Sequence, residues 1–312
     1  MKRIFSILLT IIGLMSASAP DASAKSGDLF IYPVPPDSMQ MLQSRCDYIV
    51  TRFWDRCNFG TAFDKYPEQL NAAFGDWVAI MPHASADSVH VAIDRLLKRF
   101  EKKGPETLAL ATMAENWLYS DTADYTSEEA YLPFAKAAAT HKKIGKADRA
   151  RFESQARIIE SSSVGARVPA IPFTRADGSK GTLDDVRSGS VLLFFNDPDC
   201  LDCTMARIRL SADPNTAQLI ERGELSVVSI YPGETDDDNW EKAKASTHPS
   251  WVTVAMPEAY DYFDLRSTPL FVFLNSRHKV LASGLDIDHL LNAFMVSNQA
   301  TLQKKANEQP AE

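Results

Sequence analysis

Two cysteines separated by two residues follow an apolar run and stand at the predicted start of a helix. The run Val191–Phe195 has the character of a buried strand, Asp197-Pro198 marks a turn, and Cys200 and Cys203 follow at once. A cysteine at a helix N-terminus faces free N–H groups, which lower its thiol pKa, and a cysteine one turn later can close a disulfide. The arrangement predicts a redox pair.

A zinc site is the alternative for a C-x-x-C motif. Zinc needs four ligands, and neither a second C-x-x-C motif nor a paired histidine follows at ligand spacing. The acids Asp236–Asp238 are consecutive and point in different directions, so we interpret them as a solvated helix start. We therefore expect no metal and no cofactor.

The first residues predict export. Lys2 and Arg3 precede the apolar run 4–15, and small residues lead to Ala22-Ser23-Ala24, the pattern of a secretory signal peptide. The apolar run is too short to span a bilayer as a mature helix. We expect cleavage near Ala24 and a periplasmic or otherwise exported protein, with an uncleaved N-terminal anchor as the alternative.

Composition excludes several classes of partner. The chain has 312 residues, a formal net charge of −8 and no basic stripe, which argues against nucleic acid and anionic lipid. No second hydrophobic stretch suggests a transmembrane segment in the mature chain. With four cysteines, the protein is not a disulfide-stapled miniprotein.

The first half of the chain carries helical signals. Apolar residues recur at helical spacing, with Gly104 as a stop and Pro105 as the next first-turn residue. Predicted helices include 38–56, 66–81, 85–103 and 146–159. We assign the aromatic side chains Phe53, Trp54, Phe59, Phe63, Trp77 and Trp117 to a helical core, with a peptide-binding groove as the alternative.

After Ser161–Gly165 the spacing of apolar residues is no longer helical. A hairpin is predicted over 171–183, followed by strands that alternate with helices, a closing hairpin and a final helix over 287–296. This pattern predicts a small α/β sheet covered on both faces. The predicted division is a signal peptide over 1–24, an all-α domain over 25–163, an α/β domain over 164–299 and a flexible tail over 300–312.

The second half resembles thioredoxin-fold domains of the envelope thiol–disulfide oxidoreductase and peroxiredoxin-like branch. The resemblance rests on Leu193–Cys203, Leu225–Pro232 and Tyr262–Leu270. In that family a cis proline faces the cysteines. The resemblance therefore implies a thioredoxin-like fold and a cis Thr268–Pro269 bond.

The whole chain also resembles exported bacterial proteins in which a helical domain of unknown function precedes a thioredoxin-like domain. The matching residues are Tyr48, Phe53-Trp54-Asp55, Phe59, Trp117–Asp121 and Tyr131–Pro133. The helical domain has no assigned activity in those proteins. This second resemblance therefore predicts domain order and not chemistry.

Together, motif and resemblance imply thiol–disulfide exchange. Cys200 is the expected attacking or attacked sulfur and Cys203 the resolving one, while Thr268 and Pro269 shape a groove for an extended peptide. Expected partners are thiols or disulfides of exported proteins and an unknown electron-donor protein. The residues that tune the motif are Asp199, Leu201 and Asp202.

Departures from the family pattern leave a second hypothesis open. Negative charge at Asp199 and Asp202 opposes thiolate formation, which favours reductive or isomerising activity over strong oxidation. Phe194 stands where many thioredoxins keep a buried acid. The alternative is a non-catalytic thioredoxin-fold binding module with a structural disulfide.

A peroxidase is excluded by its own motif. The peroxiredoxin pattern needs a threonine three residues before the reactive cysteine and a proline four residues further back. Counted from Cys203, those positions hold Cys200 and Asn196.

Cys46 and Cys57 form a second pair within one predicted helix. Eleven residues of continuous helix would separate them by ~16 Å, whereas a disulfide needs Cα atoms within ~7 Å. We expect two free, buried thiols on one helix face. A helix break near Asp55 would make a bond possible.

Overall fold

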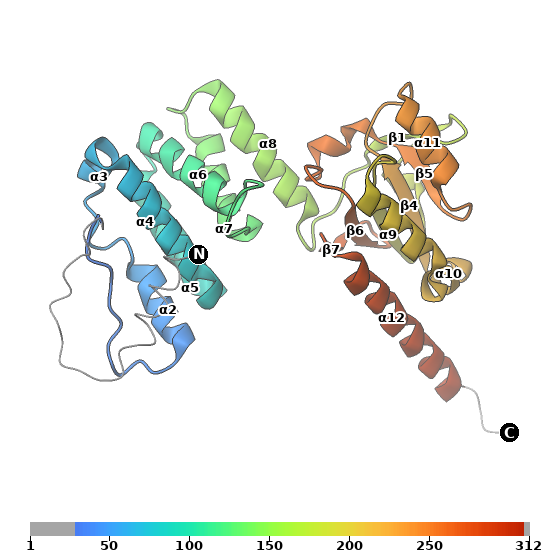
Figure 1. Ribbon diagram of the computed structural model, residues 1–312, viewed down its shortest axis with the longest axis horizontal. Coiled ribbons are helices and arrows are strands. Elements are labelled where there is room, and N and C mark those ends of the chain that lie inside the picture. The colour runs from blue at the N-terminus through green and yellow to red at the C-terminus, as the bar shows by residue number, and fades with distance from the viewer. Residues whose placement is uncertain (1–28, 309–312) are drawn as a thin grey trace. The chain divides into compact units, whose positions relative to one another are not determined.

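The computed structural model describes residues 29–308, so the predicted signal peptide lies outside the described residues. The chain divides into two compact units, Met1–Ala156 and Arg157–Glu312, and each is described by itself. The first unit is helical and the second is an α/β sheet domain (Figure 1). The predicted boundary after residue 163 falls just beyond helix α8, whereas the two units divide inside that helix.

The helical unit consists of amphipathic helices with short connections, as predicted. Its core is dominated by aromatic side chains, among them Trp77, Phe74 and Phe134, which are fully buried. None of the helices within residues 29–308 is long and apolar enough to cross a membrane. The helices are α2 (Leu42–Arg52), α3 (Phe59–Lys65), α4 (Pro67–Ile80), α5 (Ala86–Phe100), α6 (Gly104–Leu118), α7 (Glu128–Thr140) and α8 (Lys146–Ser162).

The first predicted helix is wrong in extent. The sequence pattern predicted one helix over 38–56, but α2 ends at Arg52, and a turn separates it from α3. The Asn58 side chain accepts the Thr61 N–H at 3.3 Å and so caps a new helix that the apolar periodicity does not reveal. Local capping overrides periodicity at this point.

The second unit contains a seven-stranded mixed sheet in the order β2-β1-β5-β4-β3-β6-β7. The central strands β3, β4 and β5 are parallel, and β1, β6 and β7 pair antiparallel with their neighbours. The strands are β1 (Pro172–Arg175), β2 (Lys180–Thr182), β3 (Ser190–Phe195), β4 (Leu225–Tyr231), β5 (Val252–Ala255), β6 (Leu270–Asn275) and β7 (Val280–Ser283).

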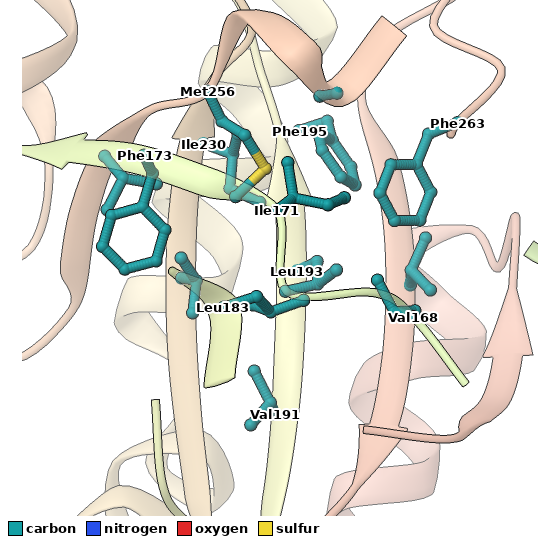
Figure 2. Packing of buried hydrophobic residues seen from close by; sticks show 14 of the residues in the cluster. Val168, Ile171, Phe173, Leu183, Val191, Leu193, Phe195, Ile230, Met256 and Phe263 are labelled. Atoms are coloured by element: carbon teal, nitrogen blue, oxygen red, sulfur yellow. The ribbon is translucent and has the colours of Figure 1, made fainter. Parts of the chain in front are cut away.

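Each face of the sheet has its own apolar core. On one face, β3 residues such as Leu192 and Phe194 pack with residues of α9, α10 and α12. On the other face, Leu193 and Phe195 pack against loops and the 3₁₀ turn around Ala259 instead of a long helix (Figure 2). Successive side chains of β3 point to opposite faces of the sheet, and both faces are buried. This explains why the sequence of β3 is apolar throughout.

The helices of this unit differ from expectation in two places. The segment after Cys200 forms two helices, α9 (Leu201–Ala212) and α10 (Pro214–Glu221), because the Asp213 side chain caps the second one through Thr216. The final helix, α12, runs from Ile287 to Glu308 and does not end at residue 296. The remaining helix, α11, spans Asp238–Ser246.

The extra length of α12 has a simple local cause. The lysine-, glutamine- and alanine-rich stretch after Ser297 favours helix, and no glycine or proline interrupts it before Pro310. Residues 300–308 are therefore helical where a flexible tail was predicted, and 309–312 lie outside the described residues.

Candidate functional site

A tight turn delivers Cys200 from strand β3 to helix α9. The Asp197 carbonyl accepts the Cys200 N–H at 3.2 Å, and Asp197 Oδ1 accepts the Asp199 N–H at 2.8 Å. An aspartate that closes such a turn through its own side chain reverses the chain within a few residues. The turn predicted at Asp197-Pro198 is confirmed, and it sets Cys200 one residue before the helix.

Cys200 is the N-cap residue of α9. Its φ of −85° and ψ of 121° are extended, and its Sγ accepts the Cys203 N–H at 3.1 Å. A sulfur in this position satisfies one of the free N–H groups of the first helical turn and lies at the positive end of the helix dipole. Cys200 is half-buried, so its sulfur keeps access to solvent.

Cys203 lies one turn further and is fully buried. Burial raises the pKa of its thiol to about 11, with a further increase from the hydrogen bond to Cys200, while Thr268 and the Asp197 backbone act in the opposite direction. Both thiols are free. The pair thus consists of one accessible sulfur and one protected sulfur.

Sheet pairing brings the cis proline to this pair. In the antiparallel ladder between β3 and β6, Phe195 is opposite Leu270, so Pro269 stands beside the end of β3. The Thr268–Pro269 peptide bond is cis, as predicted. The Cys200 thiol donates to the Thr268 carbonyl oxygen at 3.5 Å. Residues 68 positions apart in sequence therefore meet at one edge of the sheet.

The charges around Cys200 differ from the sequence-based expectation. Lys242 of α11 bonds to both carboxylate oxygens of Asp199, at 2.9 and 3.2 Å, and this interaction lowers the pKa of that carboxyl. The negative charge beside Cys200 is therefore partly neutralised by a residue 43 positions away. Asp202 and Leu201 are exposed, with Leu201 at 74 %.

A buried polar network underneath the motif was missed by the sequence analysis. Asn196 is 2 % exposed, and its amide donates to the Phe194 carbonyl at 3.0 Å and to Ser229 Oγ at 3.1 Å. Its Oδ1 accepts a hydrogen bond from Arg207 of α9 at 3.4 Å. The one sequence signal for this network was Arg207, which stands four residues after Cys203 on the apolar face of the predicted helix.

The other candidates have structural explanations. Asp237 caps α11 by accepting the Asn239 N–H at 2.9 Å, so the acidic run is a helix start, as interpreted. No group of residues in the described part of the chain could hold a metal ion. Among the aromatic residues assigned to the core, Phe53, Trp54, Phe59 and Trp77 are buried.

Cys46 and Cys57 are free thiols in different surroundings from the first pair. Cys46 is buried in the middle of α2, and Cys57 is half-buried in the turn before α3. Burial raises both pKa values, that of Cys57 to about 11. The helix breaks between them, contrary to the continuous helix predicted, but no disulfide links them.

Comparisons with known proteins also distinguish a helical part and an α/β part of the chain. Residues 15–162 match the model of a domain of unknown function, DUF5106. Most of the chain is similar to the crystal structure of a thioredoxin-like protein from Bacteroides caccae, with 25 % identity, a TM-score of 0.69, and coverage of 88 % of this chain and 99 % of that one. No curated protein matches. The C-terminal half thus has a thioredoxin-like fold.

Shorter structures match the C-terminal half. One is the C-terminal domain of an uncharacterized protein from Bacteroides fragilis, with 26 % identity, a TM-score of 0.41, and coverage of 43 % of this chain and 99 % of that one. Another is the thioredoxin domain of a thiol-disulfide oxidoreductase from Bacteroides vulgatus, with 20 % identity, a TM-score of 0.35, and coverage of 42 % and 94 %.

Proposed function

We propose that the C-terminal unit carries out thiol–disulfide exchange on exported proteins, with Cys200 as the reactive sulfur. The observation that carries the proposal is the position of Cys200. It caps α9 with its sulfur on the Cys203 N–H and remains half-buried beside Thr268. A structural thiol needs none of this, whereas a nucleophilic thiolate needs both the electrostatic support and the access.

The reaction consists of two exchanges. The Cys200 thiolate attacks one sulfur of a substrate disulfide, an S–S bond forms between protein and substrate, and the other substrate sulfur leaves as a thiolate. Cys203 then loses its proton and attacks Cys200, which closes the internal disulfide and releases the second substrate thiolate. The substrate gains two electrons, and an electron-donor protein must reduce the pair again.

Isomerisation needs no electron donor. In that case a thiol of the substrate itself attacks the mixed disulfide before Cys203 does, and Cys200 is released unchanged. Burial of Cys203 and its pKa of about 11 slow the resolving step and lengthen the life of the mixed disulfide. A longer-lived mixed disulfide leaves more time for attack by a substrate thiol, which favours isomerisation.

Thr268 and Pro269 supply the substrate groove in this proposal. The peptide groups beside Cys200 lie at the edge where β6 begins, and both residues are partly exposed. An extended peptide can pair with backbone groups there as an added strand, which holds its sulfur near Cys200. Side chains of the peptide then have little influence, so the substrate class is broad.

The proposed compartment is the periplasm or another oxidising space outside the cytoplasm. Support comes from the signal-peptide pattern that ends near Ala24. Disulfide-bearing substrates occur in such spaces. Detection of a mature N-terminus after residue 24 in an exported fraction would test this part.

The test of the activity uses two substrates and a matched set of variants. The full mature chain should reduce insulin in the presence of dithiothreitol and reactivate scrambled ribonuclease. Cys200→Ser should lose both activities, whereas Cys203→Ser should lose reduction first and keep part of the isomerase activity. If the wild-type chain matches Cys200→Ser in both assays, the exchange proposal is wrong and a non-catalytic binding module remains.

A further inference from the structure

Arg207 places a buried positive charge beneath the cysteine pair. Its side chain is 7 % exposed, and it lies four residues after Cys203, one turn further on the same face of α9. Its hydrogen-bond partners are neutral, with Nη1 bonded to Asn196 Oδ1 at 3.4 Å and Nη2 to Thr204 Oγ1 at 3.0 Å. No carboxylate within residues 29–308 forms an ion pair with it.

A buried guanidinium without an anion is unusual. An arginine in a protein does not lose its proton, and a charge removed from water needs compensation. Burial lowers the pKa of Arg207, and negative charge on Cys203 and Cys200 acts in the opposite direction. Coupling between charges is reciprocal, so a cation that is favoured by a thiolate also favours that thiolate.

We propose that Arg207 is a positioning residue of the redox pair, a fixed buried cation that stabilises the thiolate form of Cys203. Asn196 and Thr204 hold its guanidinium in place without neutralising it. The inference rests on the proposed exchange reaction for its use, but the charge effect itself is measurable without that reaction.

The resolving step shows why such a cation matters. Cys203 must lose its proton before its sulfur can attack Cys200, and its buried site disfavours the negative charge. The proton goes to the substrate thiolate that the first exchange released, since Arg207 cannot accept one. Arg207 therefore acts through charge alone. The buried acid that many thioredoxins use is absent, and Phe194 fills its place.

Other charged groups surround the pair from several elements. Asp197 and the Asp199 carboxylate paired with Lys242 come from the preceding loop and α11. Asp202 lies on α9 between the two cysteines, and the ion pair of Asp264 with Arg266 precedes Pro269 in the chain. In contrast to these partly or fully exposed groups, Arg207 is buried, so water and salt screen its effect less.

The experiment is a thiol titration in the full mature chain. Cys200→Ser, Cys46→Ala and Cys57→Ala leave Cys203 as the one cysteine, and its thiolate is followed by ultraviolet absorbance against pH. In this background, Arg207→Gln should raise the titration midpoint by at least about one unit, a tenfold loss of thiolate at a given pH below the midpoint. Arg207→Lys, which keeps the charge, should recover at least about half of the shift.

Arg209→Gln is the matched control. Arg209 stands two residues further on the same helix, is half-exposed, and bonds to Asp288 at the surface. Its removal should leave the midpoint unchanged. If Arg207→Gln shifts the midpoint no more than Arg209→Gln does, the proposal is overturned.

A variant that fails to fold must be distinguished from one that folds and refutes the proposal. Circular dichroism checks each variant, and Arg207→Met removes the charge while it keeps an apolar chain in the buried site. A raised midpoint in Arg207→Met supports the inference, and an unchanged midpoint refutes it. A shifted midpoint in a chain without exchange activity would keep the Arg207 inference and reject the proposed function, so the two can fail separately.

Discussion

The two cysteine pairs of this chain share a residue type but not an environment. Cys200 caps a helix, accepts an N–H group and is half-buried beside the Thr268 carbonyl. Cys46 is buried within α2, beyond its first turn, and Cys57 follows in a turn. The comparison teaches that the position of a sulfur relative to a helix start decides what the thiol can do.

The partners of each pair strengthen this contrast. Two positive groups accompany the first pair, Arg207 below it and Lys242 at the surface. For Cys46, the adjacent Asp47 raises the thiol pKa further, and Arg45 only partly offsets this effect. The two pairs thus differ in the charges around them.

The largest expected effect on the insulin-reduction rate comes from replacing Cys200, in comparison with replacing Cys46 and Cys57. Cys200→Ser should lower the insulin-reduction rate by at least about a thousandfold, because no second sulfur of the site is equally accessible. Cys46→Ala with Cys57→Ala should leave that rate within about twofold, since both thiols have a packing role. An equal loss in the two variants would break the comparison.

Alkylation against pH should separate the pairs next. The pKa of Cys57 is raised to about 11 from an ordinary value of 9.0, which leaves it about a hundredfold less thiolate at pH 8 than an ordinary cysteine. Its alkylation rate should rise about tenfold per pH unit up to that value, because the reagent reacts with the thiolate. Cys200 should be labelled first at neutral pH.

Mass spectrometry of the labelled peptides measures both rates in one sample. The denatured chain is the control, and there the four cysteines should react at similar rates. Preferential labelling of Cys57 over Cys200 at pH 7 in the folded chain would contradict the assignment of the reactive pair.

A smaller effect should come from the surface beside Cys200. Leu201 is 74 % exposed between the two cysteines, whereas the residues adjacent to Cys46 are the charged Arg45 and Asp47. Leu201→Ser should raise KM for insulin by about threefold to fivefold through lost apolar contact. It should leave exchange with glutathione unchanged. Leu281→Ser, at an exposed residue of β7, is the control. An equal effect on both substrates would instead assign Leu201 to the chemistry.

The smallest effect concerns Lys242. Lys242→Gln leaves the Asp199 carboxylate without its cation, so the alkylation rate of Cys200 at pH 7 should fall by about twofold. High salt should remove the difference, since both side chains are exposed. Lys244→Gln on the same helix, where Lys244 bonds to Glu241, should have no effect. A larger fall that resists salt would contradict the screening argument.

Much of the fold could be predicted because periodicity and stop signals are local. The run from Ser85 to Lys103 has a capping serine and an amphipathic stripe, and the helix α5 lies within it. The stop predicted at Gly104 is wrong, because α5 ends at Phe100 and Gly104 is the first residue of α6. The caps of α3 at Asn58 and of α10 at Asp213 were missed. Both helices are short, so they contain too few apolar residues to show a helical spacing.

The site could be predicted only where residues are close in sequence or belong to a known pattern. Cys200 and Cys203 follow from the motif, and the cis peptide bond at Pro269 follows from the resemblance. Lys242 reaches Asp199 from a helix that follows α9, α10 and β4 in the chain, so no local pattern pairs them. Arg207 depends on which face of α9 is buried, and one sequence does not fix this for a charged residue.

The reduction potential of the Cys200–Cys203 pair decides whether the pair works in thiol–disulfide exchange or forms a structural disulfide. It is measured by equilibrating the full mature chain in glutathione buffers, with Cys200→Ser as the control and both Cys46 and Cys57 replaced by alanine. A working exchange pair should have a potential between about −120 and −270 mV. A potential below about −300 mV, where structural disulfides lie, would contradict the account and leave a thioredoxin-like binding module.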